Sequence, residues 1–221
     1  MIAPADFIRS HLPLIAVSGL SGVALHLAVP TSGLRRLTNQ TPYWAYVWAG
    51  GAVLARYVQD NPGIVRGRRV LDLGAGSGLV GIVAAQAGGM VLAAEIDPVG
   101  QVAIGLNAAA NEVSISVLGG NILSGPPPQV DLILVGDLFY DQDLVSPVLD
   151  FLDRALIRGI EVLIGDPGRT PLPVARLDRV AGYCVPDFGR PSLAPATVFR
   201  LKPDAGPAPV VTSQHRSPAI Q

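Results

Sequence analysis

Glycine occupies every second position from Gly74 to Gly78, and this segment is one of the places in the chain best suited to chemistry. These glycines follow a short apolar run and precede an apolar pattern with helical spacing, which predicts a strand, a tight turn and a helix N-terminus. In that geometry, bare backbone can lie against an adenosine-type ligand. The next apolar run ends at Glu95, whose carboxylate can accept hydrogen bonds from both hydroxyls of a ribose. We therefore predict that these residues bind a nucleoside cofactor.

Two cofactor classes fit this glycine loop. Gly76, Gly78 and Gly81 satisfy the spacing of dinucleotide-binding proteins, but a pyrophosphate at a helix N-terminus disfavours nearby carboxylates. In the other frame Asp72 precedes the glycines inside the strand, which resembles the first motif of the seven-strand S-adenosylmethionine-dependent methyltransferases. S-adenosylmethionine carries an ammonium and a sulfonium in place of phosphates, so a nearby carboxylate is tolerable or useful. We favour S-adenosylmethionine as the cofactor, with a dehydrogenase as a distant alternative.

Three more residues are predicted to contact this cofactor. Asp72 would lie near its amino-acid portion, and the alternative is that Asp72 bonds only backbone amides in the loop. Asn121 follows the third predicted strand and would reach the adenine edge, unless it is a turn residue. Trp44 belongs to a stretch that is dense in aromatic residues and would form a wall of the site.

A second chemical motif follows the fourth predicted strand. Asp137 and Tyr140 lie just after an apolar run, so they should face the reactive end of the cofactor at the carboxyl edge of the sheet. Their acid-x-x-aromatic spacing resembles the signature of methyltransferases that modify lysine side chains of proteins. The alternative is a helix N-cap with a packing tyrosine. We predict that both residues are catalytic and that Asp137 also contacts the cofactor.

Within that group, the chain is most similar to the electron-transfer flavoprotein β-subunit lysine methyltransferases. The resemblance covers about residues 20–201 and includes Leu25–Ala28, Pro42–Gly51 and Gly165–Arg169. It implies a protein-lysine N-methyltransferase that uses S-adenosylmethionine and acts on the β subunit of electron-transfer flavoprotein. Another protein, such as a ribosomal one, or a small amine remains an alternative substrate. A non-catalytic binding protein is the alternative from another class.

The chemistry of lysine assigns a role to Asp137. A free lysine is almost entirely ammonium at pH 7, and its deprotonation costs about 4 to 5 kcal/mol. A carboxylate at Asp137 would attract the ammonium and fix its nitrogen for transfer. The same carboxylate raises the pKa of the amine, so we assign Asp137 to positioning and not to deprotonation. The proton goes to water or to a nearby carboxylate, and these alternatives stay open.

The predicted substrate-binding residues are mostly aromatic. Trp44, Phe139 and Tyr140 would exclude water from the amine and stabilise methylated cations through their ring faces. Trp48 would belong to the same wall or lid, and the alternative for it is a ring packed on the sheet.

Two polar residues after the fifth predicted strand complete the substrate site. Asp166 and Arg169 could shape the substrate entrance, although an aspartate before proline is equally well explained as a turn.

The elements that must position these residues alternate regularly from residue 68 onward, which favours a parallel sheet covered on both faces. We predict strands 70–73, 91–95, 114–118, 130–135, 161–164, 183–188 and 197–201 and helices 52–58, 79–87, 99–111, 144–158 and, more weakly, 172–181. The last two strands would form an antiparallel hairpin at one edge. The predicted fold is α/β, a Rossmann-like seven-strand methyltransferase sheet with an N-terminal helical extension.

Composition limits the partners and the compartment. The chain has 16 basic and 17 acidic residues, a balance that argues against a nucleic-acid surface. One cysteine, Cys184, cannot form an internal disulfide, so we expect a cytoplasmic protein. The histidines show no metal-ligand spacing, and no metal site is predicted. Residues 12–29 are apolar but interrupted by Pro13 and Gly19, so we expect ordinary structure there, with no membrane partner. We expect a monomer.

The chain is divided into three predicted parts. Residues 1–60 would form an extension packed on the core, and residues 61–202 the S-adenosylmethionine-binding methyltransferase domain. Residues 203–221, rich in proline and serine, would form a disordered tail.

Overall fold

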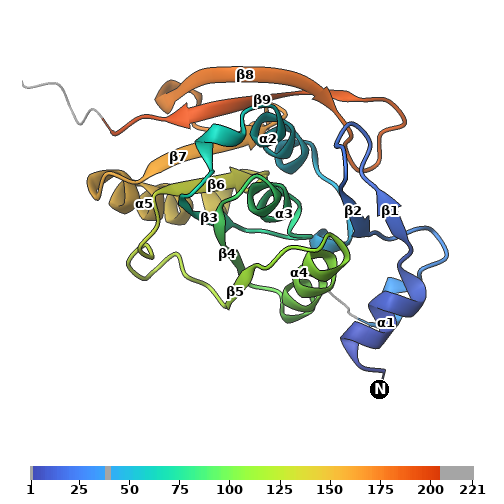
Figure 1. Ribbon diagram of the computed structural model, residues 1–221. Coiled ribbons are helices and arrows are strands. Elements are labelled where there is room, and N and C mark those ends of the chain that lie inside the picture. The colour runs from blue at the N-terminus through green and yellow to red at the C-terminus, as the bar shows by residue number, and fades with distance from the viewer. Residues whose placement is uncertain (1, 38–40, 205–221) are drawn as a thin grey trace, which may run out of the picture.

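A seven-stranded sheet forms the centre of the protein, with the strand order β5-β4-β3-β6-β7-β9-β8 (Figure 1). The computed structural model describes residues 2–37 and 41–204. β3 to β7 are parallel, whereas β9 is antiparallel to both of its neighbours, β7 and β8. The strands are β3 (Arg69–Leu73), β4 (Met90–Glu95), β5 (Ser116–Gly119), β6 (Leu132–Gly136), β7 (Glu161–Asp166), β8 (Leu177–Val185) and β9 (Ala194–Leu201). The predicted α/β, mostly parallel sheet with an antiparallel edge is confirmed.

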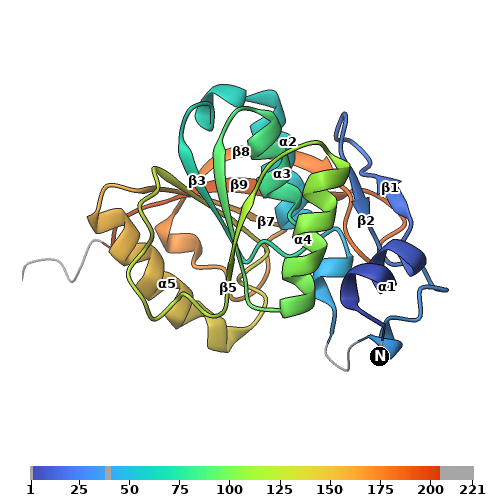
Figure 2. The same cartoon turned by 60° about the horizontal axis from the view of Figure 1, so that its bottom comes forward.

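The central strands are apolar because helices cover both of their faces. One apolar core joins side chains such as Val70 and Leu134 to α2 (Ala49–Asp60) and α3 (Leu79–Gln86). The other joins Leu71 and Ile133 to α5 (Gln142–Ile157). Figures 1 and 2 show α5 on the opposite side of the sheet from α2 and α3. α4 (Pro98–Ala110) lies beside β4 and β5, toward one edge of the sheet.

Register brings the carboxyl ends of the central strands together. Leu73 at the end of β3 pairs with Ala94 of β4 on one side and with Val135 of β6 on the other. The residues that follow β3, β4 and β6 therefore meet at one edge of the sheet, as the sequence predicted.

Backbone contacts place the N-terminus of α2 against that same edge. A Cβ atom on Gly50 would collide with the carbonyl oxygen of Gly165, one residue before the end of β7, and a Cβ on Gly136 would lie 2.8 Å from the Cα of Gly51. Glycine is required here because the helix backbone packs directly on the backbone of β6 and β7. This close approach puts the first turn of α2 beside Asp137.

The N-terminal segment holds a helix and a small hairpin. α1 (Pro4–His11) is followed by β1 (Leu14–Ala16) and β2 (Ala24–His26), which pair as a separate antiparallel sheet. The side chains of Asn107 on α4 and of Asn111, its C-cap residue, accept hydrogen bonds from the backbone amides of His26 and Ala24, respectively. The hairpin is an addition to the predicted helical extension. Short 3-10 turns are η1 (Leu34–Arg36), η2 (Tyr43–Ala45), η3 (Pro62–Ile64) and η4 (Val174–Arg176).

The predicted helix over 172–181 is wrong. η4 occupies only its first part, and β8 then runs from Leu177 to Val185 and pairs with β9. β8 is the edge strand and only Val185 in it is buried, so it lacks the apolar alternation that marks a strand in sequence. Pairing with β9 determines its conformation, and a register shift between Arg179 and Ala181 bends it locally.

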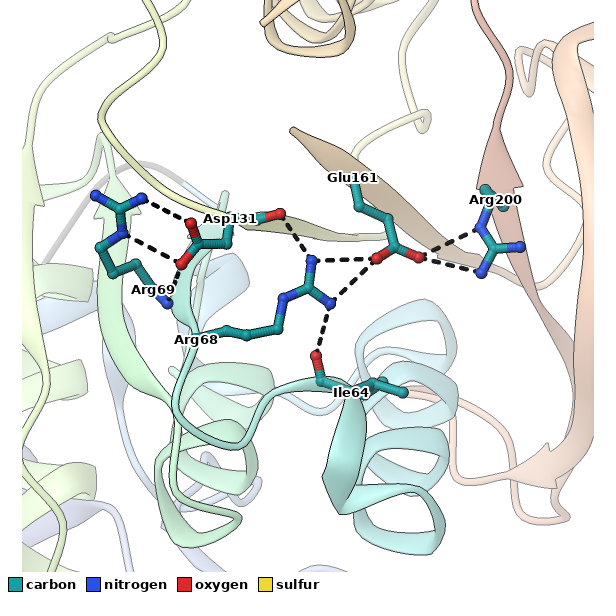
Figure 3. A network of polar contacts seen from close by, with 6 residues as sticks. All are labelled: Ile64, Arg68, Arg69, Asp131, Glu161 and Arg200. Carbon is teal, nitrogen blue, oxygen red and sulfur yellow. Dashed lines mark hydrogen bonds and ion pairs between the residues drawn. The ribbon is translucent and has the colours of Figure 1, made fainter. Parts of the chain in front are cut away.

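A charged network lies at the amino ends of the same strands (Figure 3), whereas Asp137 follows the carboxyl end of β6. The guanidinium of Arg68 donates two hydrogen bonds of 3.1 Å to Glu161, which also accepts from Arg200. Arg69 pairs with Asp131 at 2.6 Å and lowers the pKa of that carboxyl to about 2. The network ties the starts of β3, β6, β7 and the end of β9 together.

The structure bears only partly on the expectations about a membrane partner and about the division of the chain into parts. Within residues 2–37 and 41–204, no helix combines the length and the apolarity needed to cross a membrane. The predicted tail lies outside the described residues from residue 205 onward. The boundaries at residues 60 and 202 stay predictions.

Candidate functional site

A cavity of about 820 Å³ opens at the carboxyl ends of β3, β4 and β6. Nine of the predicted site residues line it: Trp44, Trp48, Gly74, Gly76, Glu95, Asn121, Asp137, Tyr140 and Arg169. Four others lie outside the lining: Asp72, Gly78, Phe139 and Asp166. The two predicted motifs, the glycine loop and the segment after β6, therefore share one cavity.

The glycine loop is tied to Glu95. Gly74 and Gly76 adopt positive φ angles of 70° and 54°, a region that favours glycine. The amide of Gly76 donates to Glu95 Oε2 at 2.8 Å, and the amide of Asp97 donates to Oε1 at 2.8 Å. Burial raises the pKa of the Glu95 carboxyl, although these amide hydrogen bonds oppose the rise. Each oxygen keeps a lone pair that a ribose hydroxyl could use.

Asp72 is placed behind this loop and not in the cavity. Its side chain is only 2% exposed, and Oδ2 accepts a hydrogen bond of 2.8 Å from the amide of Gly81 in α3. Burial raises the pKa of Asp72 to about 7. The structure thus shows the alternative role for Asp72, a hydrogen bond to a backbone amide, and gives no support for direct cofactor contact. Gly78 is the N-cap residue of α3 and likewise lies outside the cavity lining.

Trp44 and Asn121 line the cavity but also have structural partners. The Trp44 indole, 1% exposed, donates to Asp97 Oδ2 at 3.0 Å, while Oδ1 of the same carboxylate caps α4. Asn121 Oδ1 accepts the amide of Leu123 at 3.0 Å, which is the turn geometry given above as its alternative. A turn role and a cavity position therefore coexist at Asn121.

Asp137 is held by three hydrogen-bond donors. Oδ2 accepts the amide of Gly51 in the first turn of α2 at 3.0 Å. Oδ1 accepts from Nε and Nη2 of Arg169, at 3.0 and 2.6 Å. The backbone of Asp137 has a φ of 54°, and its amide donates to the carbonyl of Gly165. Burial raises the pKa of the Asp137 carboxyl, and Arg169 and the α2 amides oppose that rise.

The predicted alternative for Asp137, a cap for the helix that follows it, is wrong. α5 is capped by Asp141, whose Oδ1 accepts the amide of Asp143 at 3.0 Å. Asp137 instead receives an amide of α2, a helix far away in the sequence. A partial positive charge at that helix N-terminus favours a carboxylate there.

Asp166 builds the loop that presents Arg169. Asp166 is 1% exposed, and its Oδ1 accepts the amides of Gly168 and Arg169 at 2.6 and 2.7 Å. This is the turn alternative for Asp166, and its side chain does not line the cavity. The guanidinium of Arg169 lies 6.0 Å from the centre of the Trp48 ring. Arg169 therefore faces both a carboxylate and an aromatic face.

Aromatic side chains surround the mouth of the cavity. Tyr43 lies between Trp48 and Tyr140, with ring centres 5.8 and 5.3 Å away. Phe188, from the loop after β8, packs 5.3 Å from Trp48 and extends the cluster. The sequence prediction missed Tyr43 and Phe188. Tyr43 lies in the aromatic stretch Pro42–Gly51, so the sequence pattern could have indicated it, whereas no motif surrounds Phe188. Phe139, predicted to bind substrate, is 0% exposed and packs in the α5 core.

The acidic residues around the cavity do not form a metal site. Within the described parts of the chain, no group of three or more His, Cys, Asp or Glu side chains could hold a metal ion.

Comparison with known proteins places this geometry in a family. A family model described as lysine methyltransferase matches residues 39–169. A relative from Xenopus laevis, named electron transfer flavoprotein beta subunit lysine methyltransferase, is 36% identical over 215 residues, covering 90% of this chain and 87% of that protein. Relatives of the same name from Mus musculus and Homo sapiens are 47% and 44% identical over 58% and 59% of this chain, and the match spans 51% of the length of each.

Solved structures share the fold at lower identity. A Pyrococcus horikoshii protein provisionally described as an RNA methyltransferase aligns over 93% of this chain and 98% of its own, with a TM-score of 0.54 and 16% identity. TrmN from Thermus thermophilus aligns over 67% of this chain and 48% of its own, with a TM-score of 0.51 and 25% identity. The first of these likenesses shows the fold alone.

Proposed function

This chain belongs to the lysine methyltransferase family, and we propose that it transfers a methyl group from S-adenosylmethionine to a lysine side chain of a protein. The observation that carries the proposal is the single cavity that joins two kinds of site. Gly76 and Glu95 offer backbone and carboxylate groups suited to an adenosine. Asp137 and Tyr140 offer a carboxylate and an aromatic face suited to an amine.

The charges of the cavity favour S-adenosylmethionine over a dinucleotide. Glu95, Asp97 and Asp137 all line it, and among the described lining residues Arg169 is the only cation. Arg169 is already paired with Asp137, so a pyrophosphate would meet the carboxylates of Glu95 and Asp97 and no free cation among the described lining residues. S-adenosylmethionine has no phosphate and carries cationic groups, which suit this lining. When bound, it supplies a methyl group activated by attachment to a cationic sulfur.

The residues of the chain would bind and orient the amine. A lone pair on Asp137 Oδ2 remains after its bond to Gly51 and can accept a hydrogen bond from the target nitrogen. Trp48, Tyr140 and Tyr43 would exclude water and face the cation through their rings. The target lysine is an ammonium in solution, and the proton that it must lose before methyl transfer leaves to water. Asp137 contributes position, in keeping with the role assigned to it from sequence.

We propose the β subunit of electron-transfer flavoprotein as the protein substrate, because the relatives from mouse, frog and human carry that substrate in their names. The test incubates the purified chain with methyl-labelled S-adenosylmethionine, the purified β subunit and, separately, cell extract. Label on lysine of the β subunit is the expected result. Label on another protein or only on small molecules would contradict this substrate, and no label anywhere would contradict the activity.

Asp137→Asn is the matched catalytic variant for that test. Asparagine keeps an oxygen for the Gly51 amide and tolerates a positive φ, but its amide oxygen is a weaker acceptor for the target nitrogen than a carboxylate and cannot pair with Arg169 as an ion. We expect transfer to fall by about a hundredfold or more, with donor binding by calorimetry unchanged. Asp141→Asn, which keeps a good cap on α5, should transfer at the wild-type rate. Near-normal turnover by Asp137→Asn would remove Asp137 from the mechanism.

We also propose that the protein acts in the cytoplasm as a monomer. The exposed Cys184 suits a reducing compartment. Cell fractionation and light scattering test these two points.

A further inference from the structure

The ion pair between Asp137 and Arg169 alters what the catalytic carboxylate can do to an amine. The guanidinium places two donors on Oδ1, in the bidentate geometry that makes such pairs strong. The Asp137 side chain is 10% exposed and that of Arg169 is 27% exposed, so water screens the pair only weakly. An amine that bonds Asp137 therefore meets a carboxylate already neutralised by a neighbouring cation.

An isolated carboxylate would create a chemical problem for this reaction. It binds the target lysine as ammonium and raises the pKa of the amine, yet only the neutral amine has the lone pair needed for attack. A cation close to the same amine has the opposite effect, because it disfavours a second positive charge. Arg169 is such a cation, since only the Asp137 carboxylate separates its guanidinium from an amine hydrogen-bonded to Oδ2.

We propose that Arg169 is a positioning residue that neutralises Asp137, so that the site orients the target lysine by a hydrogen bond while holding it as the neutral, nucleophilic amine. This inference rests on the proposed methyl transfer to lysine. The ammonium proton leaves to water before transfer, and Asp137 keeps its own charge throughout. The proposed role also gives Arg169, the cation of the segment Gly165–Arg169, a function beyond shaping the substrate entrance.

Packing holds Arg169 in this place. Its backbone amide is fixed by Asp166, and its guanidinium lies over the ring of Trp48. Burial alone would lower the pKa of Arg169, but the hydrogen bonds and charge of Asp137 raise it above its ordinary value, so the guanidinium stays charged. The loop, the ring and the carboxylate together leave the side chain little freedom.

The other charged groups near the pair have partners of their own. Asp166, the last residue of β7, accepts two loop amides on Oδ1, whereas its buried Oδ2 has no hydrogen-bond partner among the described residues, and burial raises the pKa of this carboxyl. Asp187, from the loop after β8, accepts the amide of Ala49 and pairs with Arg190. Glu95 at the end of β4 accepts the amides of Gly76 and Asp97. Burial raises the pKa of Tyr140, which keeps that hydroxyl neutral. Among the described residues, Arg169 is the cation that forms an ion pair with Asp137.

The test measures kcat and KM between pH 6.5 and 9.5 for the full chain, Arg169→Gln and Arg169→Lys, with the purified β subunit as the methyl acceptor. In Arg169→Gln, Asp137 would bind the ammonium more strongly. We expect the midpoint of the rise of kcat with pH to move upward by about one to two units. At pH 7, kcat should fall about tenfold or more while KM stays equal or falls, and the rate should recover toward high pH. Arg169→Lys keeps the charge and should restore most of the wild-type midpoint.

Arg176→Gln is the matched control. Arg176 also forms a bidentate pair with a carboxylate, that of Asp153, but lies outside the cavity lining. Its loss should leave the midpoint of the pH profile unchanged.

Three results for Arg169→Gln would overturn the inference. They are an unchanged midpoint, an equal loss of kcat at every pH together with a raised KM, or a higher kcat at pH 7, which would mean that Arg169 blocks the site. Absence of transfer by the wild-type chain would instead refute the proposed function on which the inference rests.

Discussion

At the scale of single residues, the two aspartates at the ends of β3 and β6 differ in what surrounds them. Asp137 faces the cavity, with a guanidinium and a helix amide on its carboxylate. Asp72 is enclosed, and among the hydrogen bonds of the described residues its carboxylate has one partner, the amide of Gly81. One partner does not replace the water that a carboxylate loses on burial, which explains the raised pKa of Asp72.

This difference predicts how stability depends on pH. The pKa of Asp72 is about 7 in the folded chain and about 3.9 in an unfolded one. The folded state therefore keeps a proton that the unfolded state has lost, so this group lowers the free energy of unfolding as pH rises from about 4 through 7. Through this group, the free energy of unfolding of the wild-type chain should fall by about 2 to 3 kcal/mol between pH 5 and pH 8. The variant Asp72→Asn should not show this fall, because asparagine does not titrate.

Chemical denaturation of both proteins at the two pH values measures this effect. Because Glu95, Asp137 and Asp166 also have raised pKa values, the quantity that decides is the difference between wild type and variant. Parallel pH dependence in the two proteins would show that Asp72 does not titrate in this range.

At the scale of elements, the site depends on how closely α2 approaches the sheet. The first turn of α2 packs on the ends of β6 and β7 through glycine backbones. Two free amides of this turn donate to side-chain carboxylates from distant loops. Those carboxylates belong to Asp137 and Asp187. The helix has no cap of its own, since Trp48 at that position makes no side-chain capping bond. Folding of α2 and placement of Asp137 are therefore coupled.

Gly50→Ala tests this packing. The added methyl group would collide with the Gly165 carbonyl and lie 2.6 Å from Asp137 Oδ2, so α2 must shift. We expect the free energy of unfolding to fall by about 2 to 3 kcal/mol and methyl transfer to fall with it. Gly105→Ala in α4 is the control, because a Cβ there meets nothing within 4 Å. It should be neutral or stabilising by up to about 1 kcal/mol. Equal stability of the two variants would contradict the close approach.

At the scale of the whole molecule, the two ends of the parallel strands have different roles. The amino ends carry the ion pairs of Arg68, Glu161 and Arg200, which connect strands (Figure 3). The carboxyl ends carry the cavity, whose acidic lining leaves no free cation among the described residues. The strand-connecting ion pairs and the carboxylates that line the cavity therefore lie at opposite ends of the parallel strands.

The acidic lining predicts which adenosine-containing ligand the folded chain binds. S-adenosylhomocysteine at one hundred times its Kd should stabilise the chain by about 2.7 kcal/mol and raise Tm by several degrees. A nicotinamide dinucleotide at the same concentration should leave Tm unchanged, because its phosphates meet Glu95 and Asp97. Thermal unfolding with each ligand measures this. A larger shift with the dinucleotide would refute the choice of cofactor.

Local patterns in the sequence were enough to predict a mostly parallel sheet with an antiparallel edge, and to place the glycine loop and Asp137 at the carboxyl ends of its strands. Apolar runs, the glycines at residues 74–78 and the acids Glu95 and Asp137 at strand ends are local patterns, and parallel strands bring their carboxyl ends together by geometry alone. Only the tertiary structure decided which way each side chain turned. It enclosed Asp72 and Phe139, made β8 a strand, packed Phe188 against Trp48 and brought Arg169 onto Asp137. These outcomes depend on contacts between residues far apart in the chain, and such contacts leave no periodic trace in the sequence.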